Sequence, residues 1–268
     1  MTDDRNFSSL QPDLIRNKLS KSIFATNIVF HETVDSTNTL AKDLAAHGAA
    51  DGTIVISEEQ TAGKGRMGRA WLSPGHSNLY LSLVLRPAIK PDQVFVLTMV
   101  MALATIDGVE AMSGLGPKIK WPNDLYAGER KLGGILTEFS VRDKAVEYVV
   151  LGLGLNVNWN PGKGQGIIYP ATSVLQETGR KISRNGLLVE ILRSFEDYYG
   201  RVLAEDIAEF YDTWNERSMI LGKPVEIKTT DCSFFGRALR IDHKGALVIE
   251  DDNGREHTFL SGDVSVKF

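Results

Sequence analysis

The sequence predicts an α+β fold, in which a mixed sheet with packed helices precedes a small C-terminal β-barrel of SH3 size. Strand-like alternation and helical periods take turns as far as about residue 220. The segment 94–112 is apolar on nearly every side, which favours a helix buried against a sheet. Beyond 222–224, short strands follow one another with only turn residues between them.

These changes of character divide the chain into a lead-in helix at 1–26, a large domain at 27–220 and a β-domain at 221–268. A first strand is expected at 27–32. A helix is expected at 39–47, because Leu40, Ala41 and Leu44 keep a helical period and Gly48 can end it. The polar residues at 35–38 suit the cap of this helix, but the hydroxyls of Ser36 and Thr37 would equally suit a polar ligand.

The remaining elements of the large domain follow from the same patterns. Pro91 suits the first turn of a helix that runs to Met112, with Gly114 beyond its end. Two more helices are expected at 186–203, capped by Asn185, and at 207–214. Five further strands are expected at 53–58, 78–85, 118–120, 131–140 and 147–157.

The β-domain shows five strand signals, and Asn253-Gly254 predicts a tight hairpin between two of them. The expected strands lie at 225–230, 233–241, 246–250, 256–260 and 264–266.

Composition narrows the class of protein. The chain has 268 residues, with 30 positive and 34 negative side chains, whereas a dedicated nucleic-acid binder is usually strongly basic. The longest apolar run, 94–106, is too short to span a bilayer, and the N-terminus carries no signal-peptide core. The single cysteine, Cys232, excludes an internal disulfide and a cysteine-based zinc site. A cytoplasmic protein is therefore expected.

The most unusual stretch is 57–72, where three glycines alternate with three cations. Glycine allows a tight turn and close approach to a ligand, and successive N–H groups in such a turn can bind an anion. Lysine and arginine add full positive charge at the same place. The loop therefore suggests a cradle for phosphate or carboxylate, although a mobile surface loop or a nucleic-acid contact would have a similar composition. The residues concerned are Gly63, Lys64, Gly65, Arg66, Gly68 and Arg69.

Two common nucleotide-binding motifs do not fit this loop. The dinucleotide fingerprint needs a helix after the glycines and an acidic residue about 20 positions on. Here a strand-like segment follows at 78–85, and no acidic residue lies near position 85. A P-loop fails because Glu58 stands where the first glycine belongs, and Gly65 replaces the serine or threonine.

Two further stretches carry unusual polar residues. The first, 118–126, runs a strand into Trp-Pro-Asn-Asp, which is a turn-forming sequence and could simply carry an exposed ion pair. The second begins with Lys131 beside Gly133 and Gly134 in an otherwise apolar strand, so Lys131 is expected to have an anionic partner.

A third stretch, 151–158, alternates glycine with apolar residues. Gly152 and Gly154 would either leave space for a flat group or allow tight sheet packing. The amide of Asn156 could contact the edge of a heterocycle.

Together these stretches resemble the biotin protein ligases, the biotin–[acetyl-CoA-carboxylase] ligases. The resemblance rests on ordered motifs at 35–38, 60–71, 120–125 and 131–136, with 152–158 and the β-domain also matching, and it extends from about residue 27 to the end. It implies the class II synthetase-like catalytic domain of the biotin and lipoate ligases, followed by an SH3-like domain. It also implies that ATP and Mg²⁺ convert biotin to biotinyl-5′-AMP, and that a lysine of a carrier domain then takes the biotin.

The resemblance also implies roles for individual residues. Lys131, Arg66 and Asp124 would be catalytic, with Lys131 bridging the carboxyl oxygen and the α-phosphate. The biotin site would comprise Ser36, Thr37, Asn38, Gln60, Gly63, Lys64, Gly65, Arg66, Trp71, Lys131 and Gly134. The ATP and adenylate site would comprise Lys64, Arg66, Met67, Gly68, Arg69, Trp71, Asn123, Lys131 and Asn156, with Asn123 and Asp124 as Mg²⁺ ligands.

The chain departs from the family pattern at two places. Lys64 replaces an arginine, which keeps the charge but loses the bidentate fork. Residues 1–26 are too few for the winged-helix DNA-binding domain that some members carry, so neither DNA binding nor repression is expected. A biotin carboxyl carrier protein domain is the expected acceptor, no membrane partner is expected, and a homodimer is left open.

Two alternatives stay open at this stage. A lipoate or octanoyl transferase shares the overall fold, but such enzymes lack the combination of basic loop and Lys-Trp-Pro-Asn-Asp. A non-catalytic module that binds biotin or nucleic acid would use the basic loop for polyanions, which the acidic balance of the chain disfavours.

Overall fold

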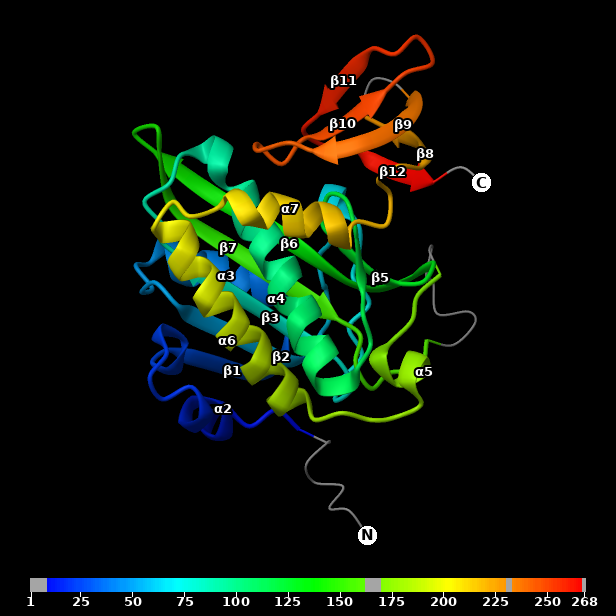
Figure 1. Cartoon of the computed structure of the whole chain (residues 1–268). Coiled ribbons are helices and arrows are strands. Elements are labelled where there is room, and N and C mark those ends of the chain that lie inside the picture. Colours follow the sequence, from blue (N-terminus) through cyan, green and yellow to red (C-terminus); the bar gives the residue numbers. More distant parts are fainter. Residues whose placement is uncertain (1–8, 162–169, 230–232, 267–268) are drawn as a thin grey trace.

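The computed structural model describes residues 9–161, 170–229 and 233–266. It contains a seven-stranded sheet with helices on both faces and a separate five-stranded sheet at the C-terminal end (Figure 1). The predicted α+β architecture is confirmed.

The large sheet has the strand order β1-β2-β3-β7-β6-β5-β4. Only the β1–β2 pair is parallel, and every other neighbouring pair in this sheet is antiparallel. The strands are β1 Ile28–Val34, β2 Thr53–Gln60, β3 Leu79–Leu85, β4 Lys118–Lys120, β5 Asp124–Ala127, β6 Arg130–Arg142 and β7 Ala145–Leu155. The sequence analysis did not predict β5. This short strand begins at Asp124, directly after the Trp-Pro-Asn turn, and pairs with both β4 and β6.

Helices α4 and α6 pack together over one face of the sheet, and α3 covers the other face (Figure 1). The helices are α2 Pro12–Lys18, α3 Thr37–Ala46, α4 Phe95–Ser113, α5 Val174–Thr178, α6 Arg184–Leu203 and α7 Ala208–Arg217. Short 3₁₀ turns lie at η1 Ile23–Ala25, η2 Arg66–Gly68 and η3 Pro91–Gln93. Pro91 thus opens the 3₁₀ turn, and the α-helix itself starts at Phe95.

The prediction for the cap of α6 was wrong. Ser183 is the N-cap, and its hydroxyl accepts a hydrogen bond from the backbone N–H of Gly186 at 3.1 Å. Asn185 lies inside the first turn, where its side chain donates to the Ser9 carbonyl at 2.9 Å and accepts from the Gln11 N–H at 2.8 Å. The amide therefore fastens the lead-in segment instead of capping the helix.

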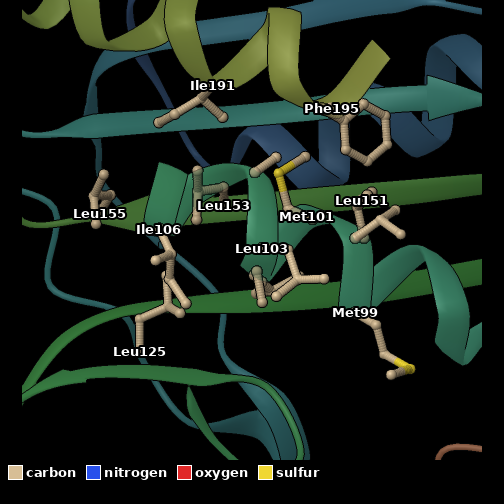
Figure 2. Packing of buried hydrophobic residues seen from close by; sticks show 14 of the residues in the cluster. Met99, Met101, Leu103, Ile106, Leu125, Leu151, Leu153, Leu155, Ile191 and Phe195 are labelled. Atoms are coloured by element: carbon tan, nitrogen blue, oxygen red, sulfur yellow. The ribbon is translucent and has the colours of Figure 1, made fainter. Parts of the chain in front are cut away.

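Helix α4 is the centre of the main core. Figure 2 shows its methionine and leucine side chains among residues of β7 and α6, including Leu151, Leu153 and Phe195. Helices α4 and α6 approach each other closely at Gly108 of α4, where a Cβ would lie only 2.7 Å from the side chain of Ile191 of α6. By length and composition Pro91–Ser113 could cross a membrane, but 78% of its apolar window is buried inside the protein, which is typical of a core helix.

The C-terminal sheet is antiparallel throughout, with the order β11-β10-β9-β8-β12. The predicted hairpin at Asn253-Gly254 is present between β10 and β11, and Gly254 has a φ of 76°. The indole of Trp121 donates a hydrogen bond to the Gly245 carbonyl at 2.9 Å and so connects the large domain to this sheet. The strands are β8 Pro224–Lys228, β9 Ser233–Ile241, β10 Leu247–Glu250, β11 Glu256–Phe259 and β12 Asp263–Val266.

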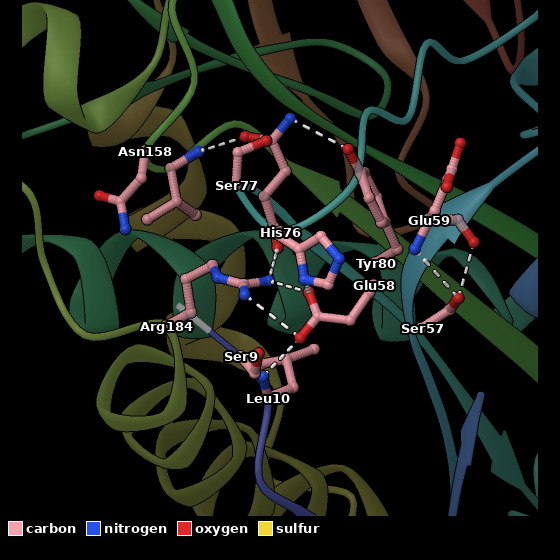
Figure 3. Close-up of polar contacts among 12 residues, drawn as sticks. Ser9, Leu10, Ser57, Glu58, Glu59, His76, Ser77, Tyr80, Asn158 and Arg184 are labelled. Carbon is pink, nitrogen blue, oxygen red and sulfur yellow. Dashed lines mark hydrogen bonds and ion pairs between the residues drawn. The ribbon is translucent and has the colours of Figure 1, made fainter. Parts of the chain in front are cut away.

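A buried ion pair fastens the lead-in segment to the sheet (Figure 3). The side chains of Glu58 of β2 and Arg184 of α6 are 0% and 1% exposed, respectively. Two guanidinium nitrogens of Arg184 donate to the two carboxylate oxygens of Glu58, at 2.6 Å and 3.2 Å. The same carboxylate accepts the backbone N–H of Leu10. Arg184 also donates to the Asn78 carbonyl at 3.0 Å. The described part of the lead-in is therefore integrated into the main domain.

We predict that Glu58→Ala lowers the free energy of unfolding by about 3–5 kcal/mol, because it leaves the charge of Arg184 buried without its counter-ion. Urea denaturation would measure the change. The matched control is Glu256→Ala, which removes one partner of the exposed Arg240–Glu256 pair and should leave stability nearly unchanged. Equal effects for the two variants would contradict the structural importance of the buried pair.

Candidate active site

The basic loop folds back on itself as a narrow hairpin. The Trp71 N–H donates to the Gly63 carbonyl at 2.8 Å, and the Gly65 N–H donates to the Arg69 carbonyl at 2.7 Å. The turn at the tip is left-handed at Met67 and Gly68, with φ values of 56° and 73°. The N–H of Gly65, expected to face an anion, is therefore satisfied inside the loop in this conformation.

The loop lines an open pocket of about 520 Å³ beside strand β6. A pocket of this volume is in the range that small-molecule ligands occupy. Leu136 and Glu138 form the side of the pocket that belongs to the sheet, and the loop supplies Ala62, Gly63, Lys64, Gly65, Arg66, Met67, Gly68, Arg69 and Ala70.

Lys131 lies at the start of β6 with the anionic partner that the sequence predicted. Its Nζ is 2.7 Å from Oδ1 of Asp124 on the adjacent strand β5, and both side chains are about one quarter exposed. The ammonium also lies 5.3 Å from the ring centroid of Trp71, a distance typical of a cation–π contact. Gly134 keeps this corner open, because a Cβ there would lie 3.2 Å from Asp124 and 3.5 Å from the Lys131 amine.

Arg66 extends from the tip of the loop to the turn before β5. Its guanidinium donates to Oδ1 of Asn123 at 3.1 Å, and the Asn123 amide donates to the Ile135 carbonyl at 2.6 Å. Burial lowers the pKa of the Arg66 guanidinium, and the nearby Asp124 partly offsets that effect. An arginine that has already lost part of its hydration is suited to bind an anion at little further desolvation cost.

Arg69 reaches across to the C-terminal sheet. One of its nitrogens lies 3.1 Å from Oδ1 of Asp263, at the start of β12, and a second nitrogen contacts the other carboxylate oxygen. Hydrogen bonds from Arg69 hold the pKa of Asp263 below its ordinary range. The β-domain therefore contributes a counter-ion to the loop, a contact that the sequence analysis did not predict.

A polar cluster lies buried between α3 and strands β2, β3 and β6. Ser36 is at the N-cap position of α3, but its hydroxyl makes no cap hydrogen bond. Thr37 contacts Oε1 of Gln60 through its backbone N–H at 2.9 Å and its hydroxyl at 3.1 Å. The Gln60 amide in turn donates to Ser73 at 2.8 Å. The hydroxyl of Ser36 thus remains available for a function other than capping.

The alternating glycines of β7 make room for side chains of the protein itself. A Cβ on Gly154 would lie 2.5 Å from the indole of Trp71, and one on Gly152 would overlap the amide of Asn38. The flat group expected beside this strand is therefore, in this conformation, the Trp71 ring. Asn156 is buried, with its Nδ2 donating to the Thr172 carbonyl at 2.9 Å, and its Oδ1 has no hydrogen-bond partner among the residues that the structure describes.

Asn123 and Asp124 are poorly arranged to hold a metal by themselves. The side-chain oxygen of Asn123 accepts from Arg66, and one oxygen of Asp124 pairs with Lys131. Among the residues that the structure describes, no group of three metal-binding side chains is found. Mg²⁺ usually retains several waters and binds substrate phosphates together with one or two carboxylates. Asp124 fits only that accessory role.

The structure adds four side chains to those that sequence reasoning selected. Ser73, Ser82, Glu138 and Asp263 all contact predicted site residues. Glu138 lies only a few positions after the 131–136 motif in the same strand, and its charge in a partly buried strand was a usable signal. Ser73 directly follows the basic stretch 57–72, whereas Ser82 and Asp263 lie in segments with no distinctive local pattern, so only the fold brings those two to the site.

Comparison with known proteins agrees with this geometry. A family model described as "Biotin/lipoate A/B protein ligase family" matches residues 30–156, and one described as "Biotin protein ligase C terminal domain" matches residues 220–267.

Two curated relatives and one solved structure are similar over most of the chain. The bifunctional ligase/repressor BirA of Bacillus subtilis is 34% identical over 253 residues, which cover 94% of this chain and 78% of that protein. The biotin–[acetyl-CoA-carboxylase] ligase of Paracoccus denitrificans is 33% identical over 226 residues, which cover 83% of this chain and 93% of that protein. The biotin protein ligase of Aquifex aeolicus, solved with biotin and ATP, superposes with a TM-score of 0.77 at 27% identity. The superposition covers 90% of this chain and 99% of that protein. The chain therefore belongs to the biotin protein ligase family.

Proposed function

We propose that this chain is an ATP-dependent biotin protein ligase that makes biotinyl-5′-AMP and transfers the biotin to a lysine of a biotin carboxyl carrier domain. The observation that carries this proposal is the meeting of Arg66, Asn123, Asp124 and Lys131, which come from three separate motifs, in one cluster. Arg66 of this cluster also lines the pocket. The names of the Paracoccus relative and of the Aquifex complex support the same activity. The match to a biotin protein ligase C-terminal domain favours biotin over lipoate.

In the first step, a carboxylate oxygen of biotin attacks the α-phosphorus of ATP, and the bond to the departing pyrophosphate breaks. Two anions must approach each other, so positive charge has to offset their repulsion and the charge that develops on the phosphoryl oxygens. Lys131 is the residue we assign between the carboxyl oxygen and the α-phosphate, and Asp124 holds its ammonium in place at 2.7 Å. Arg66 and Arg69 are assigned to the phosphates.

The remaining substrate contacts are assigned by position. Ser36, Thr37 and Gln60 lie in the buried polar cluster and are assigned to the ureido ring of biotin. Trp71 lies between Gly154 and Lys131 and is assigned to the apolar tail. The amide oxygen of Asn156, unpaired within the described part of the chain, suits the exocyclic amine of adenine. Mg²⁺ supplies additional positive charge to the phosphates when it is bound with ATP.

In the second step, the amine of the acceptor lysine attacks the carbonyl carbon of the mixed anhydride, and AMP leaves with the electrons of the C–O bond. The amine must lose a proton as the amide forms. Water competes for the same carbonyl, so the intermediate has to be covered until the acceptor arrives. The loop at 62–70 lines the pocket and is the segment we assign to this cover.

The acceptor and setting follow from the same assignment. A carrier domain of acetyl-CoA carboxylase is the proposed acceptor, as the name of the Paracoccus relative suggests, and the cytoplasm is the proposed compartment. We propose no DNA or membrane partner. Self-association through the edge strand β1 is a further proposal that sedimentation analysis can test.

Incubation of the protein with biotin and ATP should produce biotinyl-5′-AMP, detectable by mass spectrometry. Lipoate or octanoate in place of biotin should give no comparable adenylate. Binding of biotin with no adenylate under any condition would favour the non-catalytic alternative, and a preference for lipoate would favour the transferase alternative.

We predict that Lys131→Ala lowers biotin-dependent ATP–pyrophosphate exchange by at least about 100-fold, because one preorganised charge is lost from the transition state. The matched control is Lys118→Ala, which removes an exposed lysine from β4, two strands away in the same sheet, and should leave exchange within about twofold. Near-normal exchange in the Lys131 variant would refute its assigned role.

We predict that Arg66→Gly releases biotinyl-5′-AMP before transfer, because the loop loses its hydrogen bond to Asn123 and a phosphate contact. Free adenylate should accumulate, and unrelated proteins added to the reaction should become biotinylated. Arg240→Gly, which removes an exposed arginine of the C-terminal sheet, should not have this effect. Unchanged retention of the adenylate in the Arg66 variant would contradict the covering role of the loop.

A further inference from the structure

A chain of side-chain hydrogen bonds runs from the surface of α3 into the buried polar cluster. It begins with the ion pair between Lys42 and Glu138, whose charged atoms are 2.8 Å apart. It continues through Asn38 and Ser82 to Thr37, with successive contacts of 3.1, 2.7 and 2.9 Å. Glu138 lines the pocket under the basic loop, so the chain connects the pocket wall to the cluster.

The orientation of the Asn38 amide is determined by its neighbours. Its Nδ2 lies 3.1 Å from a carboxylate oxygen of Glu138 and 3.2 Å from the Leu136 carbonyl, and both of these groups can only accept. The amide nitrogen must face them, and Oδ1 must therefore face Ser82. The absence of a Cβ at Gly152 gives the amide the space it needs.

This orientation fixes the proton of Ser82. An amide oxygen can only accept, so the single hydroxyl proton of Ser82 is donated to Oδ1 of Asn38 at 2.7 Å. The Ser82 oxygen then turns a lone pair toward the hydroxyl of Thr37 at 2.9 Å.

Thr37 consequently lies between two acceptors. Besides the lone pair of Ser82, its hydroxyl faces Oε1 of Gln60 at 3.1 Å, and that oxygen already accepts the backbone N–H of Thr37. Donating the hydroxyl proton to a ligand would leave lone pairs facing each other at these distances, which is costly in a buried site. The proton therefore stays within the protein, and the hydroxyl offers only lone pairs to a ligand.

We propose that Glu138 and Ser82 are positioning residues for biotin, which act through Asn38 to make Thr37 a hydrogen-bond acceptor that selects a ligand N–H. This inference rests on the proposed function, because biotin offers ureido N–H groups to the cluster. Lys42 supports the arrangement, since its ammonium lies 2.8 Å from a carboxylate oxygen of Glu138, and this contact raises the pKa of Lys42. Asn38 has both amide hydrogens engaged within the protein and acts as a connector in this chain.

The principal test is Glu138→Gln, which replaces a pure acceptor by an amide that can face Asn38 with either its oxygen or its nitrogen. Glu138 is partly exposed, so the variant should fold. We expect its affinity for biotin to fall about tenfold, with KM for ATP and kcat at saturating biotin within about twofold of the wild type. Glu138→Met offers no strong acceptor at all and should weaken biotin binding at least as much.

Selectivity provides a readout that a loss of packing would not change. Wild-type protein should prefer biotin strongly over an analogue methylated at a ureido nitrogen, and Glu138→Gln should reduce this preference about tenfold. Ser82→Ala should have a similar effect, and the Glu138→Gln/Ser82→Ala double variant should be little worse than the more harmful single variant, because both interrupt one chain. Glu147→Gln makes the same chemical change on β7, outside the chain, and should bind biotin normally.

The possible outcomes separate the inference from the function on which it rests. If the wild type binds biotin but Glu138→Gln binds it within twofold and keeps its selectivity, the positioning role is wrong while the proposed function stands. If the wild type itself does not bind biotin, both are wrong. A tenfold loss confined to biotin, with the selectivity reduced, supports the positioning role.

Discussion

The concentration of positive charge beside one pocket is the constraint to which the rest of the structure responds. Arg66, Arg69, Lys120 and Lys131 lie close to one another and to the carboxylates of Asp124 and Asp263. Four like charges so close together would repel one another in the partly buried site, and burial alone already lowers the pKa of Lys120. The site therefore retains an excess of positive charge, which a polyphosphate ligand would neutralise.

The two counter-ions come from different parts of the fold. Asp124 lies on β5, next to the strand that carries Lys131, whereas Asp263 opens the last described strand of the C-terminal sheet. The hydrogen bond between Trp121 and Gly245 connects the two sheets, and Trp121 lies only three residues before Asp124. The β-domain is thus a structural part of the site, because correct placement of Arg69 depends on its docking.

Local patterns in the sequence predicted most of the fold, because most strands and long helices carry a regular run or alternation of apolar residues. The basic loop and Lys131 were also recognisable, since glycine beside cations and a lysine in an apolar strand are locally unusual. The misses share a physical cause. Strand β5 contains only four residues and follows a strong turn signal, and the Asn185 amide contacts a segment about 175 residues away, so neither was encoded in its immediate neighbours.

Long-range contacts also explain why the glycines of β7 were ambiguous. Nothing near Gly152 or Gly154 in the sequence indicates that Asn38 and Trp71 will occupy the space beside them. Once both side chains are in place, they cannot move toward the strand, and each is held from one side by backbone. Rigid placement of side chains around a site lowers the entropy that a ligand must overcome, so under the proposed function these glycines would contribute to binding without contacting the ligand.

Conformational entropy also bears on whether the basic loop at 62–70 can move over a ligand. Arg66 donates a hydrogen bond to the side-chain oxygen of Asn123, and Arg69 donates to the carboxylate of Asp263. When phosphate oxygens replace these acceptors, one charge-assisted hydrogen bond is exchanged for another, so the arginines need not pass through an unpaired state. The ordering of a glycine-rich segment costs conformational entropy, but a hairpin already closed by the Gly63–Trp71 and Gly65–Arg69 hydrogen bonds has lost part of that entropy before a ligand binds. Under the proposed function, closure over the substrate would then be mainly a shift of a preformed hairpin, so the loop could cover the reactive intermediate and still open for the acceptor lysine.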